Sequence, residues 1–445
     1  MRIIVLLSIS LAMPLLAQDL RFRFGLESDM NYRDSDEAKF GIPFPFPEEF
    51  LPPGETSGSL ETVQAGSYYE MSRFTLVGHM EYGQWSGHAK VDVIDLYDRN
   101  PTSSDRQWDM DEIWIRYGTE SEPGDVPEAR SFFVKLGKFG KFERQDDRHL
   151  VSYGLASTVF NRLEDAGMEG GFQITKNIYV KGSYTVGNPL FLRDANALAG
   201  DNGSPARNPF INPFPDPPYK SGFVFFYDAE IEDLRFSEAE LGLAGGFWYG
   251  DDYGRRSVNV LVSYFERDLR DTVDMRGSFY GGDMDLLLGV EELGLPPGLP
   301  LEGKSKEELT ITSWVYFDSG TLFLQSIDSE VAGLGRTALE GELSWTFKLP
   351  LWLAFQKSQI LPSVTPAIRY SKLEPDFVGN AGVYPTPSVW WEWKKLDYGV
   401  SARLYRGWRL FIEYSDNQFL RLGKWEHADE FLTTLRWRWN SEQEK

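Results

Sequence analysis

Acidic and basic side chains are mixed closely between residues 140 and 165 of this 445-residue chain. Lysine and arginine attract anions and aspartate attracts cations, so a cluster of both signs selects ions when it borders a narrow aqueous passage. Six charged residues of this segment are therefore candidates for a constriction, provided that the rest of the chain encloses such a passage. They are Lys141, Arg144, Asp146, Asp147, Arg148 and Arg162.

A second group consists of arginines at the polar positions of segments in which polar and apolar residues alternate. Its members are Arg21, Arg23, Arg369, Arg403, Arg409, Arg436 and Arg438. Guanidinium groups stay charged, so arginines side by side on one wall attract anions. Acidic residues at polar positions offer the alternative that the two signs pair and merely fill the interior. These acids are Glu340, Glu342, Asp397 and Glu413. The sequence leaves both alternatives open.

Residues suited to catalysis or to metal binding are few. The chain has no Cys and only four His. His79 precedes Glu81 by two residues and His149 follows an Asp-Asp-Arg run, so each could form a dyad with a carboxylate. A polar histidine that lines an interior explains both equally well, and the acidic run Asp34–Glu37 lacks the spaced turn geometry of a calcium loop. We therefore expect no enzyme activity, no catalytic residues, no cofactor and no metal site.

The element that organises the chain is Phe431–Trp439, which reads F-L-T-T-L-R-W-R-W. Its period of two predicts a β-strand with one aromatic face and one arginine face, which fits a strand between lipid and water. Leu20–Glu27 (L-R-F-R-F-G-L-E) alternates in the same way. Because a free sheet edge in a membrane leaves backbone polar groups unsatisfied, we expect these two segments to pair and to close a barrel.

About sixteen segments alternate in this way, an even number as single-chain bacterial barrels require. Long connections rich in Pro and Gly alternate with short turns, so the long ones lie at the external end and the short ones at the periplasmic end. The segment from 140 to 165 is the third external connection. The sequence thus predicts an all-β, transmembrane, antiparallel up-and-down barrel with long external loops.

Composition agrees with export to an outer membrane. Residues 1–17 have the charged start and short apolar run of a cleaved signal peptide, and residues 18–445 form a single barrel domain without a helical anchor. The formal net charge of −22 argues against nucleic acid as a partner. We expect outer-membrane lipid, lipopolysaccharide and small solutes or ions as partners, with a homotrimer as a further possibility.

At the third external connection the chain resembles the Gram-negative outer-membrane porins. The likeness covers the mature chain in its architecture, without a specific motif. Leu136–Arg144 (L-G-K-F-G-K-F-E-R) loosely resembles the post-strand segment of phosphate-selective and alginate-export porins. The resemblance implies that residues 140–165 fold inward and narrow the pore.

The sequence therefore predicts a porin for passive diffusion of small hydrophilic solutes, with anion preference carried by the arginines. The alternatives are a barrel selective for carbohydrate or for polysaccharide export, a barrel enzyme, and a closed structural or adhesive barrel.

Overall fold

The computed structural model describes residues 20–41, 53, 59–63, 65–95, 109–120, 128–142, 148–152, 154–156, 165–186, 239–252, 256–268, 305–331, 334–350, 354–355, 358–376, 392–421 and 424–441. Within these ranges, sixteen long strands form one closed sheet. They are β1 (Leu20–Ser35), β4 (Gly66–Tyr82), β5 (Trp85–Asp95), β6 (Asp109–Gly118), β7 (Phe132–Phe139), β8 (Asp165–Gln173), β9 (Ile178–Thr185), β10 (Glu240–Asp252), β11 (Arg256–Asp268), β12 (Ser305–Phe317), β13 (Gly320–Val331), β14 (Leu334–Trp345), β18 (Ser363–Asp376), β19 (Trp393–Arg403), β20 (Trp408–Arg421) and β21 (Lys424–Asn440).

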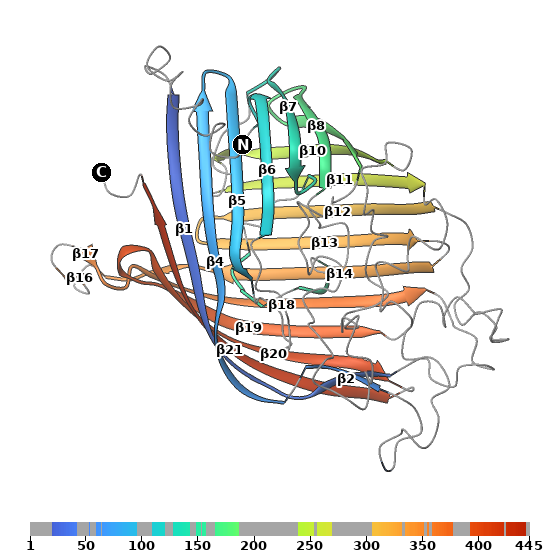
Figure 1. The fold of residues 1–445 in the computed structure, drawn as a ribbon, viewed down its shortest axis with the longest axis vertical. Coiled ribbons are helices and arrows are strands. Elements are labelled where there is room, and N and C mark those ends of the chain that lie inside the picture. Colours follow the sequence, from blue (N-terminus) through green and yellow to red (C-terminus); the bar gives the residue numbers. More distant parts are fainter. Residues whose placement is uncertain are drawn as a thin grey trace, which may run out of the picture.

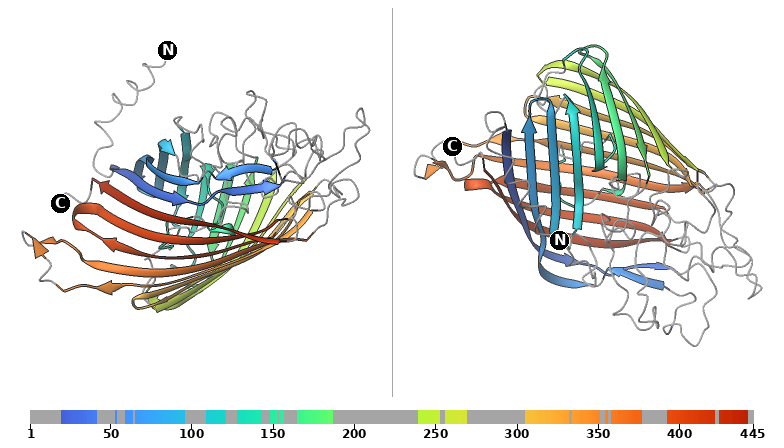
Figure 2. Two further views of the ribbon diagram at one scale, coloured as in Figure 1. Left: turned by 90° about the horizontal axis from the view of Figure 1, so that it is seen from below. Right: turned by 45° about the horizontal axis from the view of Figure 1, so that its top comes forward.

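The strands follow one another around the ring in chain order, each antiparallel to its neighbours, and β21 returns to pair with β1 (Figures 1 and 2). The predicted all-β up-and-down barrel of about sixteen strands is confirmed. No helix in the described part of the chain is long and apolar enough to cross a membrane. The signal peptide predicted at residues 1–17 lies outside the described residues.

The first and last strands pair as predicted, but the predicted segments Leu20–Glu27 and Phe431–Trp439 do not lie opposite each other along their whole length. Leu26 lies opposite Trp439 and Asp34 lies opposite Phe431. The first strand therefore continues for eight residues beyond the predicted end at Glu27. Its outer positions there include polar residues, which hid the alternation, whereas its inner positions stay buried throughout.

The two faces of the wall differ as the alternation predicts. In β11 and β12 every second side chain is buried and the others are mostly exposed. The exposed ones include the large apolar residues Val262, Tyr264, Leu309 and Ile311. The buried ones point inward and are largely polar or charged. An apolar outer face and a polar interior are what a barrel needs in order to stand in a bilayer.

Aromatic side chains gather at both ends of the outer face. At the end with the short turns, which we call the turn end, ring centroids lie 4.9 Å apart for Trp85–Tyr117, 5.7 Å for Phe317–Trp345 and 6.3 Å for Trp408–Trp437. At the opposite end, the loop end, Tyr32–Tyr69 and Tyr398–Tyr414 lie 4.8 and 5.2 Å apart. Two such girdles mark the two interfaces of a membrane.

Short elements lie at both ends of the barrel. At the loop end, β2 (Ala38–Gly41) pairs with β3 (Ser59–Val63). At the turn end, β16 (Ala354–Phe355) and β17 (Ser358–Gln359) form a hairpin that projects beyond the wall (Figure 1). A 3-10 turn, η7 (Tyr405–Gly407), joins β19 to β20, with Arg406 at φ 52°.

The wall is interrupted beside Pro366. The ladder between β14 and β18 ends at Ser344 opposite Ala367. It resumes only with β15 (Phe347–Lys348), where Phe347 lies opposite Val364. Proline has no backbone N–H to donate, so the ladder is lost on one side of it.

Candidate functional site

The candidate site lies in the barrel interior, where the connection between β7 and β8 meets the wall. We call its described residues 148–152 and 154–156 the strap. The connection starts at β7 and returns to β8, yet the strap's hydrogen-bond partners lie on β14, β18 and β20. By ring order these strands are on the side of the barrel opposite β7 and β8. The strap therefore lies inside the barrel, against the far wall.

Glu413 on β20 is the strongest single anchor of the strap. Its side chain is 1% exposed. The backbone N–H of Val151 donates to its Oε1 at 2.6 Å, and the N–H of Ser152 donates to its Oε2 at 2.8 Å. Val151 also packs against Phe411 and Leu432 on the same wall. A carboxylate that accepts two backbone N–H groups fixes the position of the segment that donates them.

Two further carboxylates on β14 hold the two ends of the strap. The N–H of His149 donates to Oε1 of Glu342 at 2.5 Å, and the N–H of Ala156 donates to Oε2 of Glu340 at 3.1 Å. Arg148 pairs with the other oxygen of Glu340 at 3.3 Å. The guanidinium of Arg148 also lies over the ring of Phe323, 4.5 Å from the centroid. Both ends of the strap are thus attached to one strand.

Arg369 on β18 ties the strap to the polar wall between these acids. Its guanidinium donates to Oγ of Ser152 at 2.9 Å and also to the Ser152 carbonyl. The same side chain binds Asp397 at 2.9 Å and lies 3.6 Å from Glu342. Arg369 is 1% exposed, so its charge is paired with carboxylates of the wall and does not face the solvent. A close approach is also required at Gly154, because a Cβ there would lie 2.2 Å from Glu340.

The other root of the connection is fixed at its own wall by Lys141. Its ammonium group donates to Asp165 at 2.5 Å and to Glu240 at 2.6 Å, and Glu240 also binds Lys306 at 2.7 Å. Burial lowers the pKa of Lys141, but the two carboxylates outweigh it and hold that pKa above its usual range. Lys141 is therefore a fixed structural cation.

An aromatic cluster fills the inner wall next to this root. Phe142 stacks on Phe265 with ring centroids 5.3 Å apart. The cluster continues with Trp248, Trp314, Tyr316 and Phe323 on β10, β12 and β13, each at most 7% exposed. These rings are packed against one another and against Phe142, so in this state they serve as a core and not as an open track for a sugar.

Three arginines of the predicted basic wall meet at the turn end of the closing seam. Arg403 lies opposite Arg409, and Arg409 lies opposite Arg436, on three successive strands. Arg436 makes a two-pronged contact with Asp29 on β1, at 2.8 and 2.6 Å. Its neighbour Arg438 pairs with Glu27.

Other arginines of that wall lie apart. Arg23 pairs with Glu81 on β4, nearer the turn end. Arg369 belongs to the wall that holds the strap. Arg21 and Arg403 are exposed, and Arg409 donates to the hydroxyl of Ser401 at 3.0 Å. Within the described ranges, none of Arg21, Arg403 and Arg409 has a carboxylate partner. The sequence left two alternatives open, and each holds for part of the group: some arginines pair with carboxylates, and others have no carboxylate partner among the described residues.

The predicted constriction residues are only partly covered by the described residues. Lys141 and Arg148 lie at the two opposite walls. Arg144, Asp146, Asp147 and Arg162 lie outside the described residues. Of the candidate dyads, His79 lies 3.2 Å from Glu81. The ring of His149 contacts Ser344 at 3.0 Å and lies 3.6 Å from Glu342.

Sequence reasoning missed two kinds of functional contact. Glu27 and Asp29 were overlooked as the partners of the seam arginines, although their inward parity on β1 was a usable signal. Glu340, Glu342 and Glu413 were expected to pair with arginines, whereas two of them mainly receive backbone N–H groups of the strap. A backbone donor leaves no trace in the sequence.

Comparison with known proteins places this geometry among the outer-membrane barrels. The outer membrane channel DcaP of Acinetobacter baumannii superposes with a TM-score of 0.50 at 10% identity, over 95% of this chain and 97% of that one. The chain has the fold of the outer-membrane porins.

Two other solved structures resemble the barrel at similar coverage. OprB of Pseudomonas putida gives a TM-score of 0.49 at 11% identity, over 96% of this chain and 95% of that one. The anion-selective porin of Comamonas acidovorans gives 0.44 at 8% identity, over 94% of this chain and 99% of that one. No protein-family model matches the sequence, and a search of curated proteins returned no match.

Proposed function

We propose that the protein is an outer-membrane channel for passive diffusion of small hydrophilic solutes, narrowed by the connection between residues 140 and 165. The observation that carries this proposal is the attachment of the strap to the wall opposite its own strands. A segment held across the interior reduces the open cross-section, and the charges that border it then face any solute at short range. Passage through such a channel needs no catalytic residue.

The channel prefers anions in this proposal. Arg403 and Arg409 stand side by side at the turn end, next to Arg436, and like charges in a narrow lumen raise the local anion concentration. Arg436 is compensated by Asp29, so the uncompensated charge is that of the other two. Two fixed positive charges without carboxylate partners in the described part of the lumen favour anions over cations.

Conductance in planar lipid bilayers tests both the channel activity and the anion preference. We expect steady single-channel conductance from the refolded protein, and a reversal potential in a KCl gradient with the sign of chloride preference. The double variant Arg403→Ala/Arg409→Ala should move the reversal potential towards cations. The control Arg256→Ala removes an exposed arginine that pairs with Asp318 in a turn, and should leave the reversal potential unchanged. A folded barrel whose reversal potential ignores the double substitution would disprove the anion preference.

A closed barrel is the second candidate, because much of the described inner wall is buried. Glu340 and Asp397 are fully buried, and Trp314 is 2% exposed. In that case the interior is filled and the protein is structural or adhesive. Silent bilayers with correctly folded protein would favour this candidate over the channel. Assembly into a homotrimer remains a prediction, which the mass of the detergent-solubilised protein tests.

A further inference from the structure

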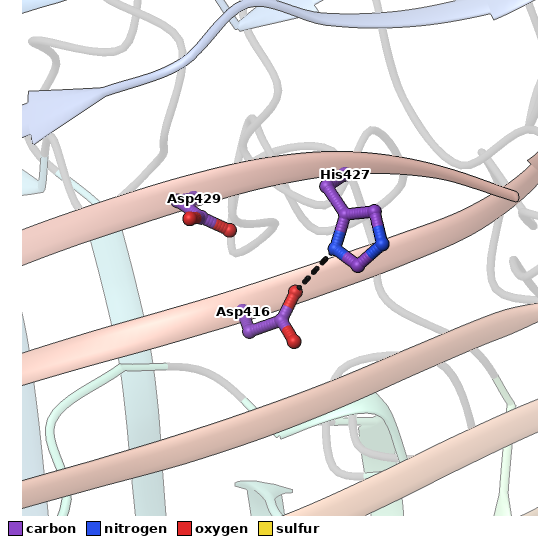
Figure 3. Close-up of side chains that lie close together, drawn as sticks. All are labelled: Asp416, His427 and Asp429. Atoms are coloured by element: carbon purple, nitrogen blue, oxygen red, sulfur yellow. Dashed lines mark hydrogen bonds and ion pairs between the residues drawn. The ribbon is translucent and has the colours of Figure 1, made fainter.

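Three side chains of types that commonly bind metal ions, one His and two Asp, meet on the outer face of the barrel near the loop end. Asp416 belongs to β20, and His427 and Asp429 belong to β21 (Figure 3). In the ladder Asp416 lies directly opposite Asp429. One ligand atom from each of the three lies within 4.8 Å of the other two. Neither the barrel interior nor the proposed channel uses this cluster.

The cluster contains an unsatisfied carboxylate oxygen. Oδ1 of Asp429 is buried and has no hydrogen-bond partner, whereas Oδ2 accepts a hydrogen bond from the hydroxyl of Tyr414. Two aspartates directly opposite each other repel, and an unpaired buried oxygen costs further free energy. A cation among the three side chains would remove both costs.

Among the described residues, no lysine or arginine pairs with Asp416 or Asp429. Gln418 donates to Oδ2 of Asp416 at 2.8 Å. The ammonium of Lys394 on β19 lies over the ring of Trp425, 3.8 Å from its centroid, and 3.7 Å from Glu392. On the other side, Asp36 accepts the backbone N–H of Asp429 at 3.1 Å and so adds another carboxylate. The local charge is therefore negative.

We propose that Asp416, His427 and Asp429 form a binding site for a divalent transition-metal ion such as Zn²⁺. One imidazole with two carboxylates is a donor set that suits these ions, whereas Ca²⁺ and Mg²⁺ prefer oxygen alone. Nδ1 of His427 and Oδ1 of Asp416 are 2.9 Å apart. Two donors about 2.1 Å from a tetrahedral ion are about 3.4 Å apart, so this hydrogen-bonded pair needs to open by only about 0.5 Å to become two neighbouring ligands.

The position of the site lets an ion enter from solvent and links its binding to the stability of the closing strands. The side chain of His427 is 59% exposed, so an ion reaches it from the aqueous side and keeps open positions for water. Its ligands come from two adjacent strands, and β21 is also the strand that closes the barrel against β1. An ion bound to the folded state alone therefore stabilises the closing region.

Calorimetric titration with Zn²⁺ tests the site in the refolded full-length barrel in detergent. We expect one site per chain and a rise in Tm when Zn²⁺ is added. His427→Ala and Asp429→Asn should each weaken binding by roughly 10- to 100-fold or more and abolish the rise in Tm. His88→Ala, which alters a histidine of the interior, is the matched control and should bind as the unaltered protein does. In the unaltered protein, Zn²⁺ should also protect His427 from acylation by diethyl pyrocarbonate.

Several results would overturn the proposal. Equal Zn²⁺ affinity in the His427→Ala variant and in the unaltered protein would remove the imidazole from the site. Loss of binding in the His88→Ala variant alone would place the ion in the interior. Binding of Ca²⁺ as tight as that of Zn²⁺, and insensitive to His427→Ala, would show an ordinary acidic surface. Acylation of His427 that Zn²⁺ does not slow would contradict the site even if a variant failed to fold.

Discussion

Replacing Glu413 by Ala should release the middle of the strap from the far wall. The carboxylate accepts the N–H groups of Val151 and Ser152 and is 1% exposed. Hydrogen bonds to a charged group contribute about 1.5–3 kcal/mol each, so two of them contribute about 3–6 kcal/mol. Since each 1.4 kcal/mol is a factor of ten, the population of states with this contact broken should rise by roughly 10²- to 10⁴-fold.

Single-channel recording measures this release directly. Glu342, Glu340 and Arg369 still hold the rest of the strap, so the variant should fluctuate instead of losing its constriction. We expect brief steps to a higher conductance that the unaltered channel shows rarely. The conservative variant Glu413→Gln keeps one acceptor oxygen and should show fewer such steps than Glu413→Ala.

A matched control separates this effect from a general disturbance of the wall. Thr434 faces inward on the adjacent β21 and is fully buried, and its hydroxyl has no hydrogen-bond partner. Thr434→Val should leave the recordings unchanged. If Glu413→Ala assembles normally and its conductance and fluctuations equal those of the unaltered channel, the strap does not border the conducting path.

Three further outcomes follow from individual contacts. Arg436→Ala leaves the fully buried Asp29 without its partner and should lower the free energy of unfolding by about 3–5 kcal/mol, measured by urea titration in lipid vesicles; replacing both residues by apolar ones should recover most of it. Because the pKa of Lys141 is raised, its ion pair with Glu240 should stabilise the fold fully below about pH 10.4 and be lost only as the pH rises through the higher folded value; stability that falls already between pH 7 and pH 9 in the unaltered protein, but not in Lys141→Met, would contradict this. Gly154→Val should displace the strap and raise conductance. A conductance equal to that of the unaltered channel would show that the larger side chain fits without moving the strap.

The barrel could be predicted from sequence because lipid and water impose opposite chemistry on the two faces of each strand. Strand β7 shows this signal, since Phe132, Val134 and Leu136 alternate on its exposed face. The end of β1 was missed, because Ser28 and Asp34 interrupt the apolar outer face of the strand. Asp34 lies near the loop end, where the wall leaves the hydrocarbon and the apolar signal fades.

The site was predictable only in its charged wall. Parity placed Arg403, Arg409 and Arg436 on the inner face, and the register of the sheet then set them side by side. The landing place of the strap could not be derived, because its contacts with Glu413 depend on backbone N–H groups that every residue other than proline possesses. Only the closed ring brings them together.

The attachment of the strap to the far wall has a consequence for the order of assembly. Val151 and Glu413 are separated by 262 positions in the chain, so their contact has very high sequence separation. Contacts of this kind form late, because the intervening chain must first be ordered. We therefore expect the strap to dock fully only when β14, β18 and β20 are in place and the ring is almost complete. Until these strands are added, the connection between β7 and β8 lacks its anchors on the far wall, and a barrel that stops short of closure would be wide and unselective. In this architecture, selectivity is acquired together with closure.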